Sequence, residues 1–311
     1  MSIDLVAAGA ANHRSMFAAE ARAQGGVAET RYGGIFTYGD GLEAQVAFPD
    51  VPVAEEAAFA DHVVATVRSC RDVREVGWWL LDESRSASLG PKLLARGFSW
   101  GWRPNWMALD VGKLVEDLPV PAAVDIVPTP NGFAAMRGGA KIGSIRYHLD
   151  GGPAGGIYAT AVDPAHRRHG IGTALTVAAV RALAGHGCRH VLLNATALGE
   201  PAYRRAGFEL IGESGQTWWL PGHRLTTPPP SETEIAFVEA IGAGDLGTAA
   251  GTRPRDLDAA LAAEETPLDI AAITGQAESA RWLIEHGATF DLARRLHRAA
   301  LVKLLERRVT T

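Results

Sequence analysis

The chain has 311 residues, 47% of them hydrophobic and 21% charged, and a formal net charge of −5. This length provides for two or three domains with substantial cores, and the acidic balance argues against nucleic acid as the main partner, because phosphate backbones bind basic surfaces. The sequence holds no run of about 18 apolar residues and no basic stretch before an apolar core at its start, so we expect a cytoplasmic protein without a membrane span.

The first part of the chain predicts a strand at residues 76–81 and, after it, a helical stretch that ends in the pair Gly97-Phe98. No glycine-rich turn follows a strand in this part, and residues 61–70 offer no candidate for one. We therefore expect no phosphate site here.

The second part predicts strands at residues 124–127, 141–149 and 157–162. Residues 128–139, between the first two of these strands, have room only for a short hairpin.

A glycine-rich turn joins the strand at residues 157–162 to a helix predicted at residues 173–183, and it reads Arg167-Arg168-His169-Gly170-Ile171-Gly172. Such a junction leaves backbone N–H groups unpaired at the positive end of the helix dipole, where a phosphate or pyrophosphate can bind. A Walker loop would end in Gly-Lys-Ser/Thr, and a dinucleotide fingerprint would need Gly-x-Gly-x-x-Gly with an acid about 20 residues later. The turn meets neither requirement.

Downstream, a strand is predicted at residues 190–195 and a short helix at residues 200–206, which Gly207-Phe208 ends. The chain here resembles the GCN5-related N-acetyltransferase superfamily. Its members carry Val-x-Pro-x-x-Arg-x-x-Gly-x-Gly, which is matched from Val162 to Gly172, and then Tyr-x-x-x-Gly-Phe, which is matched from Tyr203 to Phe208. The resemblance implies an α/β fold with a mixed central sheet. The family also places two helices after its first strand, where they wall the acceptor pocket. Because this chain lacks them, we expect another segment to supply that wall.

The resemblance further implies transfer of an acetyl group from acetyl-coenzyme A to an amine by direct attack on the thioester. Backbone amides at the turn would hold the pyrophosphate, and Arg167 or Arg168 would add charge; these amides belong to Arg168, His169, Gly170, Ile171, Gly172 and Thr173. Ala161 and Val162 would pair with the pantetheine arm, and Asn194 would hydrogen-bond to it.

Tyr203 is the implied general acid, because a phenol with a pKa of about 10 stays protonated at neutral pH and can protonate the departing thiolate. The general base stays open among His148, Asp150, Tyr158 and a water relay.

The first part echoes the second when their Gly-Phe pairs are aligned, with Leu93 at the position of Tyr203. We therefore predict tandem copies of the fold: a degenerate copy at residues 1–115, which binds no cofactor, and a catalytic copy at residues 116–225. Tryptophans follow the Gly-Phe pair in both copies, and they serve either sheet packing or an aromatic acceptor pocket; they are Trp100, Trp102, Trp106, Trp218 and Trp219.

Three consecutive prolines at residues 228–230 predict an extended spacer. Residues 266–288 resemble one ankyrin repeat, with Thr266-Pro267 opening a helix and Gly275 and Gly287 ending helices. We predict a small all-α, ankyrin-like domain at residues 226–311, which pads or dimerises the enzyme or binds a protein partner. Because about three repeats are needed for a continuous core, we expect this module to lean on the rest of the chain.

We thus predict an acetyl-coenzyme A-dependent N-acetyltransferase that acts on a small amine, such as an amino acid derivative, a polyamine or an amino-bearing antibiotic. The alternatives are a non-catalytic acetyl-coenzyme A sensor that signals through the tail, and a protein acetyltransferase whose acceptor the tail recruits. His186 and His190 flank Cys188, but glycines interrupt any helix that would align the two imidazoles, so we expect no metal site.

Overall fold

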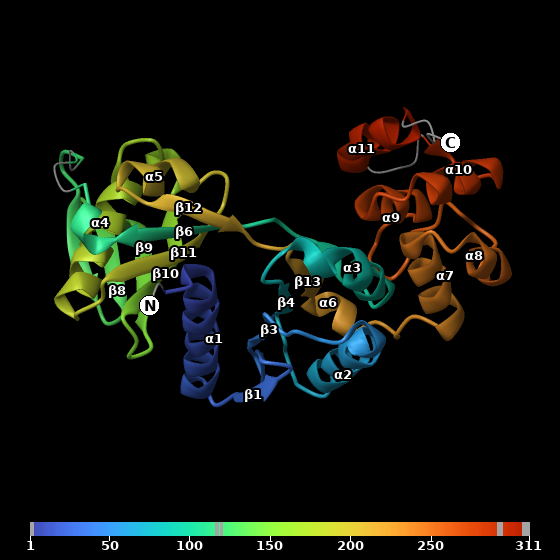
Figure 1. Cartoon of the computed structure of the whole chain (residues 1–311), viewed down its shortest axis with the longest axis horizontal. Coiled ribbons are helices and arrows are strands. Elements are labelled where there is room, and N and C mark those ends of the chain that lie inside the picture. Colours follow the sequence, from blue (N-terminus) through green and yellow to red (C-terminus); the bar gives the residue numbers. More distant parts are fainter. Residues whose placement is uncertain (1–2, 116–117, 119–120, 291–294, 307–311) are drawn as a thin grey trace. The chain divides into compact units, whose positions relative to one another are not determined.

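The computed structural model describes residues 3–115, 118, 121–290 and 295–306 (Figure 1). The chain forms two compact units, each built from two separate segments. The first unit comprises Met1–Glu20 and Arg103–Ser214, and the second comprises Ala21–Trp102 and Gly215–Thr311.

The first unit contains a seven-stranded sheet in the order β12-β6-β11-β10-β9-β8-β7. Neighbouring strands are antiparallel except β10 and β11, which are parallel, so the sheet is mixed as predicted. The strands are β6 (Asn105–Asp110), β7 (Asp125–Thr129), β8 (Gly132–Arg137), β9 (Ala140–Leu149), β10 (Ala154–Val162), β11 (His190–Ala195) and β12 (Glu209–Glu213). The predicted short hairpin at residues 128–139 contains the whole of β8, so two successive hairpins join β7 to β9.

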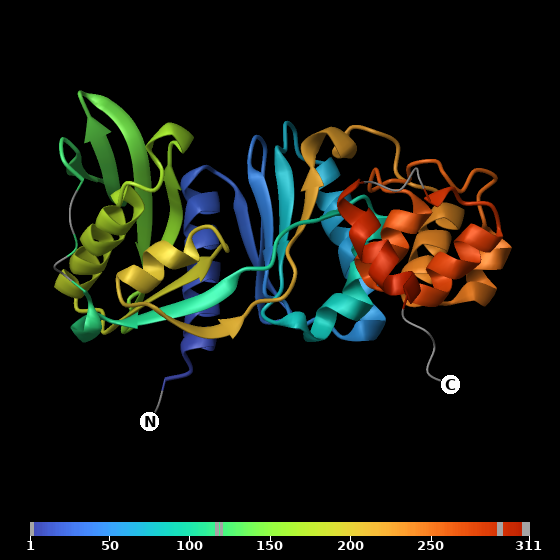
Figure 2. The same cartoon turned by 90° about the horizontal axis from the view of Figure 1, so that it is seen from above.

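Helices cover both faces of this sheet (Figure 2). They are α1 (Leu5–Ala23), of which residues up to Glu20 belong to this unit, α4 (Ile171–Gly185) and α5 (Glu200–Arg205). Apolar side chains of α4 pack with alternate residues of β10 and β11, such as Ile157 and Val191, in one buried cluster. Because successive strand residues point to opposite faces, Leu192 lies on the other face, in a smaller cluster with Leu5 of α1.

The second unit contains a six-stranded sheet in the order β1-β2-β3-β4-β13-β5. The strands are β1 (Val27–Arg31), β2 (Gly34–Tyr38), β3 (Glu43–Ala47), β4 (Glu75–Trp79), β5 (Ser99–Trp100) and β13 (Trp218–Pro221). Three helices accompany them: α2 (Glu56–Arg68), α3 (Ser86–Ala95) and α6 (Gly222–Leu225).

Two strands are exchanged between the halves of the chain. Strand β6 follows the last strand of the first half but lies between β11 and β12, whereas β13 follows β12 but lies between β4 and β5. Strand β6 buries residues on both faces, as central strands do. Strand β13 buries Trp218 and Leu220 on one face, while Trp219 and Pro221 on the other face are partly exposed. The predicted domains at 1–115, 116–225 and 226–311 are contiguous, and the observed units are not, because sequence order alone does not show which sheet a strand joins.

The tail forms helices α7 (Glu232–Ala243), α8 (Leu246–Thr252), α9 (Pro267–Thr274), α10 (Ala277–Glu285) and α11 (Arg295–Glu306). The pairs α7–α8 and α9–α10 have the same turn, in which a glycine in the left-handed region caps the first helix of the pair. Its φ is 80° at Gly244 after α7 and 73° at Gly275 after α9. Thr266 and Asp269 cap α9 reciprocally. The expectation that the tail leans on the chain is confirmed, because Phe237 and Ile241 of α7 share one core with Leu93 of α3. The ankyrin-like identity of the tail stays a prediction.

None of the described helices combines the length and the hydropathy that a membrane span requires.

Candidate functional site

The central feature of the first unit is the place where its two parallel strands part. Strands β10 and β11 pair at Ala154↔His190, Gly155↔Val191 and Gly156↔Leu192, and no further. Strand β10 continues to Val162, but its register against β9 shifts between Tyr158 and Ala161, and Ala159 has a positive φ of 49°. This bulge bends the strand and leaves backbone groups of its second half without a partner on β11.

The direction of these free groups follows from the strand alternation. The Asp163 N–H donates to Ile142 O of β9 at 2.9 Å. Because N–H and C=O groups alternate sides along a strand, Ala161 also faces β9, whereas Thr160 and Val162 face the open side. Of the two residues predicted to pair with pantetheine, Val162 is thus the one whose amide faces open space.

The predicted phosphate turn lies directly beyond this strand end. Gly170 caps α4 in the left-handed region with φ of 80°, and Arg168 also has a positive φ of 64°. The first turn of α4 contains no acidic residue. Within α4 the Ala174 N–H reaches back to Gly170 O at 2.9 Å, and the amides of the first helical residues, Ile171, Gly172 and Thr173, precede this bond. Such amides at a positive helix end form an anion site when no side chain blocks it.

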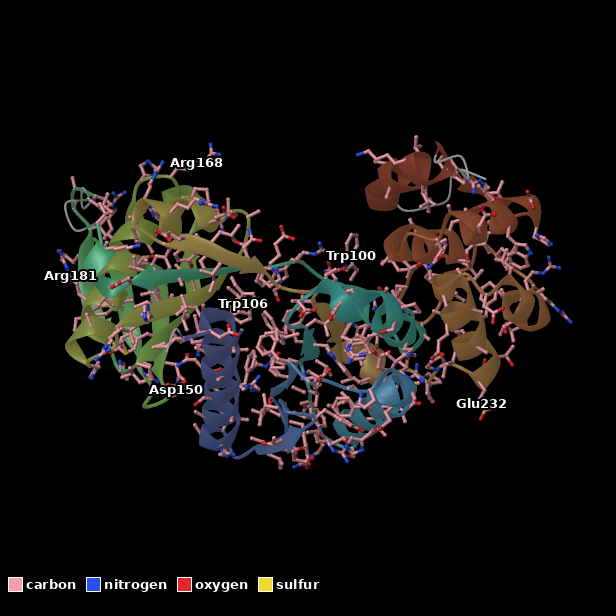
Figure 3. The ribbon with its side chains drawn as sticks, in the orientation of Figure 1. Trp100, Trp106, Asp150, Arg168, Arg181 and Glu232 are labelled. Carbon is pink, nitrogen blue, oxygen red and sulfur yellow. The ribbon has the colours of Figure 1, made fainter. Side chains whose placement is uncertain are left out.

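The two arginines of the turn differ in their surroundings. The Arg167 Nε donates to Val162 O at 2.9 Å, which ties the turn to the end of β10. The Arg168 side chain is exposed and extends away from the sheet, as Figure 3 shows. His169 is also exposed. No hydrogen bond or ion pair joins the Arg168 guanidinium to another residue that the structure describes, so Arg168 is the arginine available next to the turn.

Tyr203 lies on α5 and is 8% exposed, with its ring edge-on to Phe208 at a centroid distance of 5.8 Å. Burial raises the pKa of Tyr203, and the side chain of Thr160 beside it opposes this rise to a lesser extent. The phenol thus lies beside the side chain of Thr160 in the second half of β10, and it stays protonated at neutral pH.

Asn194 lies on β11 beyond its last pair with β10. Both atoms of its side-chain amide are buried and make no hydrogen bond of ordinary geometry with a described residue, although the amide lies close enough to His13 to act on the pKa of that imidazole. A buried polar group in that state is destabilising unless a ligand or water satisfies it.

The three candidate bases do not gather at one point. Asp150 is exposed in the turn after β9, where its Oδ1 accepts the Gly152 N–H at 2.9 Å. His148 Nε2 lies 3.0 Å from Ser15 Oγ, and burial lowers the pKa of this imidazole. The Tyr158 hydroxyl donates to Asn12 Oδ1 at 2.6 Å, and burial raises its pKa well above the ordinary value. His148 and Tyr158 thus face helix α1.

Sequence reasoning missed Asn12 and His13, which α1 places over β10 and β11. Asn12 is completely buried, and the His13 ring centroid lies 4.9 Å from that of Tyr158. Burial lowers the pKa of His13 to about 3, an effect that Asn194 partly opposes. The adjacent polar residues Asn12 and His13 in an alanine-rich helix were the signal that could have marked them as functional. Nothing in the sequence showed that this helix packs on strands from the second half of the chain.

The six-stranded sheet of the second unit shows no such opening between its described parallel strands. Its parallel strands β3 and β4 pair along their whole length from Glu43↔Glu75 to Ala47↔Trp79, and the Phe48 N–H continues the ladder to Trp79 O at 3.0 Å. Helix α2 begins with Glu56, an acid that repels an anion from a helix N-terminus.

A charge test separates the phosphate turn from an ordinary helix cap. We expect Gly172→Asp to lower the affinity for coenzyme A at least about tenfold more than the isosteric Gly172→Asn, because only the former adds a charge that repels phosphate. The same aspartate should stabilise α4 by about 0.3–1 kcal/mol through the helix dipole. Titration calorimetry and thermal unfolding measure the two effects. Equal affinities of the two variants would contradict an anion site at this turn.

Residues 91–208 match the model of the acetyltransferase (GNAT) family, which is less than half of the chain. No curated protein matches the chain. Similar solved structures include a GCN5-related N-acetyltransferase from Kribbella flavida, with 16% identity, a TM-score of 0.49, and coverage of 71% of this chain and 97% of that one. A second, from Sphaerobacter thermophilus, has 14% identity and a TM-score of 0.41, and covers 62% and 75%. A tandem GNAT protein from the clavulanic acid biosynthesis pathway has 16% identity and a TM-score of 0.41, and covers 60% and 78%.

Proposed function

We propose that the chain is an acetyl-coenzyme A-dependent N-acetyltransferase that acts on the primary amine of a small molecule. The observation that carries the proposal is the parting of β10 and β11 beside a helix N-terminus that is free of carboxylates. The first feature provides unpaired strand amides for an extended arm, and the second provides helix amides for a pyrophosphate. The family match over residues 91–208 supports the same cofactor.

In this proposal the amides of residues 168–173 hold the pyrophosphate, and Arg168 adds charge from the exposed side of the turn. The pantetheine arm runs along the open side of β10, where it pairs with Val162. Asn194 complements one pantetheine amide, because its side chain offers one unpartnered donor and one unpartnered acceptor. Among the residues that the structure describes, the first unit contains these features and the second does not, so we expect one cofactor per chain.

The reaction begins with the neutral amine of the acceptor, whose nitrogen attacks the thioester carbonyl carbon. A C–N bond forms, and the oxyanion of the tetrahedral intermediate is stabilised by a backbone N–H at the bulge of β10. The C–S bond then breaks, and the thiolate takes the phenolic proton of Tyr203. The proton that the amine nitrogen loses passes to water, and solvent then reprotonates the Tyr203 phenolate. The products are the acetamide and free coenzyme A.

Tyr203→Phe tests the general acid. We expect turnover to fall about 100-fold while affinity for acetyl-coenzyme A changes little, because the variant loses a proton donor but keeps the ring that packs on Phe208. Tyr147→Phe is the matched control, since Tyr147 packs against the same core from β9 and has no part in the proposed chemistry. Release of free thiol measures turnover. If Tyr203→Phe turns over as fast as the control, Tyr203 is not the acid.

The function itself is tested with purified full-length chain, acetyl-coenzyme A and a panel of amines. We expect coenzyme A to bind in a 1:1 ratio and free thiol to appear only with an acceptor present. Tight binding without turnover on any amine would favour the second candidate, a sensor that binds acetyl-coenzyme A and signals through the tail. Retention of the buried Tyr203 at the strand opening supports catalysis over sensing.

A further inference from the structure

Helix α1 is joined to the sheet of the first unit by three side-chain contacts, one or two helical turns apart. Asn12 accepts a hydrogen bond from Tyr158, Ser15 bonds to His148, and Glu20 pairs with Arg146. The partners come from β9 and β10, on the face opposite α4. A wall helix is thus supplied by the start of the chain, in place of the two helices that are absent after β7 (Figure 1).

One of these contacts is incomplete. The Asn12 Oδ1 accepts a hydrogen bond from the Tyr158 hydroxyl at 2.6 Å. The Asn12 Nδ2, in contrast, is buried and has no hydrogen-bond partner in the part of the chain that the structure describes. The arrangement also excludes any side chain from the strand below, because a Cβ on Gly156 would overlap both Asn12 Oδ1 and Tyr158 Oη. A buried amide donor without a hydrogen bond is destabilising by about 1–3 kcal/mol, so a ligand or an ordered water that accepts from Asn12 Nδ2 would stabilise the arrangement.

The hydrogen-bonding capacity of the pair is specific. Asn12 Nδ2 can only donate, whereas the Tyr158 oxygen, having donated its own proton, can still accept. The pair therefore offers one donor and one acceptor side by side. It complements a ligand oxygen and a ligand N–H that are a few bonds apart.

The pair and the His13 ring beside it carry no charge. His13 is neutral at physiological pH and Tyr158 is protonated, while Glu20 and Arg146 neutralise each other further along the helix. The carboxylate of Asp150, exposed in the turn after β9, raises the pKa of Tyr158 less than burial does. A diamine or polyamine would therefore find no charged partner at the pair itself for its second ammonium group. An uncharged carbonyl oxygen next to the amine suits the environment better.

We infer that Asn12 and Tyr158 bind the acceptor, and that the acceptor is a small α-amino carbonyl compound such as an amino acid amide. The Asn12 amide donates to the carbonyl oxygen and the Tyr158 oxygen accepts an N–H of the amine, which lies just before the bulge of β10. This inference rests on the proposed acetyl transfer, since it assigns the second substrate of that reaction. It makes both groups binding residues that the N-terminal helix and β10 contribute jointly.

Asn12→Asp is the most informative variant, because it keeps the oxygen that accepts from Tyr158 and replaces the donor with an acceptor. We expect the ratio of kcat/KM for glycinamide and alaninamide to that for putrescine to fall at least about tenfold. Tyr158→Phe, on β10, should lower kcat/KM for the two amides by a similar factor. Ser15→Ala is the control: it removes a contact of the same helix without touching the pair, and the ratio should stay as in the unaltered chain.

Binding provides a readout that is independent of turnover. Titration calorimetry with alaninamide should detect binding to the unaltered chain in the presence of coenzyme A and at least about tenfold weaker binding to Asn12→Asp. Acetylation of putrescine in preference to the amides, or a ratio unaffected by Asn12→Asp, would overturn the inference and leave the acetyl transfer standing. Amide binding that depends on Asn12 in a chain that acetylates nothing would sustain the site and reject the transfer.

Discussion

A chain that ends at Thr227 is expected to lose the fold of its second unit. The tail helices contribute to the same apolar core as the first half, where Phe237 and Ile241 of α7 lie in one cluster with Leu93 and Phe98. Each such side chain contributes about 1.5–3 kcal/mol when fully buried, so exposing several of them exceeds the usual net stability of about 5–15 kcal/mol. Far-UV circular dichroism and limited proteolysis of the shortened chain measure the result.

An ion network around the buried Arg96 strengthens the same expectation. Arg96, almost fully buried, donates to Asp61 and to Glu239 of α7, in each case at 2.6 Å. Removing the tail leaves the guanidinium with one carboxylate in place of two, which is destabilising at a buried position. A shortened chain that resists protease and unfolds cooperatively would show that the tail is dispensable.

A pair of substitutions tests the contact without removing the tail. In α7 a Cβ on Gly242 would lie 2.7 Å from Pro91 Cβ of α3, whereas a Cβ on Gly251 meets nothing within 4 Å. We expect Gly242→Ala to lower the free energy of unfolding by about 1–3 kcal/mol through overpacking. Gly251→Ala should instead raise it by up to about 1 kcal/mol, because alanine favours helix.

The second large effect is expected from acid. The pKa of His13 is lowered to about 3 in the folded chain, mainly by burial, against 6.5 for an ordinary imidazole. The unfolded chain therefore binds a proton between these two values and the folded chain does not, so stability is full above pH 6.5 and falls as the pH drops toward 3. At about 1.4 kcal/mol per pH unit, the loss amounts to roughly 5 kcal/mol. The lowered pKa of His148 acts in the same direction.

Hydrogen exchange of the α1 and β10 amides between pH 7 and pH 4 measures this loss locally. His13→Gln should flatten the pH dependence, since glutamine keeps a polar side chain without a titrating group. Gln in place of the exposed His186 serves as the control and should leave the dependence unchanged. If His13→Gln loses protection in acid as steeply as the unaltered chain, another group carries the effect.

Local signals in the sequence were enough to predict several strands and helices of the first unit. The apolar run at residues 191–193 predicted β11 at residues 190–195, and the glycines around Gly170 predicted where α4 begins. The pairing of β6 and β13 could not be predicted in this way, because a strand carries the same alternation in either sheet. The role of α1 escaped for a related reason, since its contact from Asn12 to Tyr158 spans 146 positions of the chain. Positions 116–117 and 119–120, at the predicted domain boundary, lie outside the described residues.

The exchanged strands also govern the order in which the chain can be completed during synthesis. In the six-stranded sheet of the second unit, strands β1 to β5 have all been synthesised once the chain reaches Trp100. Strand β13, which lies between β4 and β5, is synthesised only at residues 218–221. While the ribosome adds the intervening residues, β4 has an unpaired edge of the kind that invites non-native pairing. We therefore expect the first half of a newly synthesised chain to stay incompletely folded until the second half supplies β13. Neither sheet can then be excised or transplanted as one continuous segment of the chain.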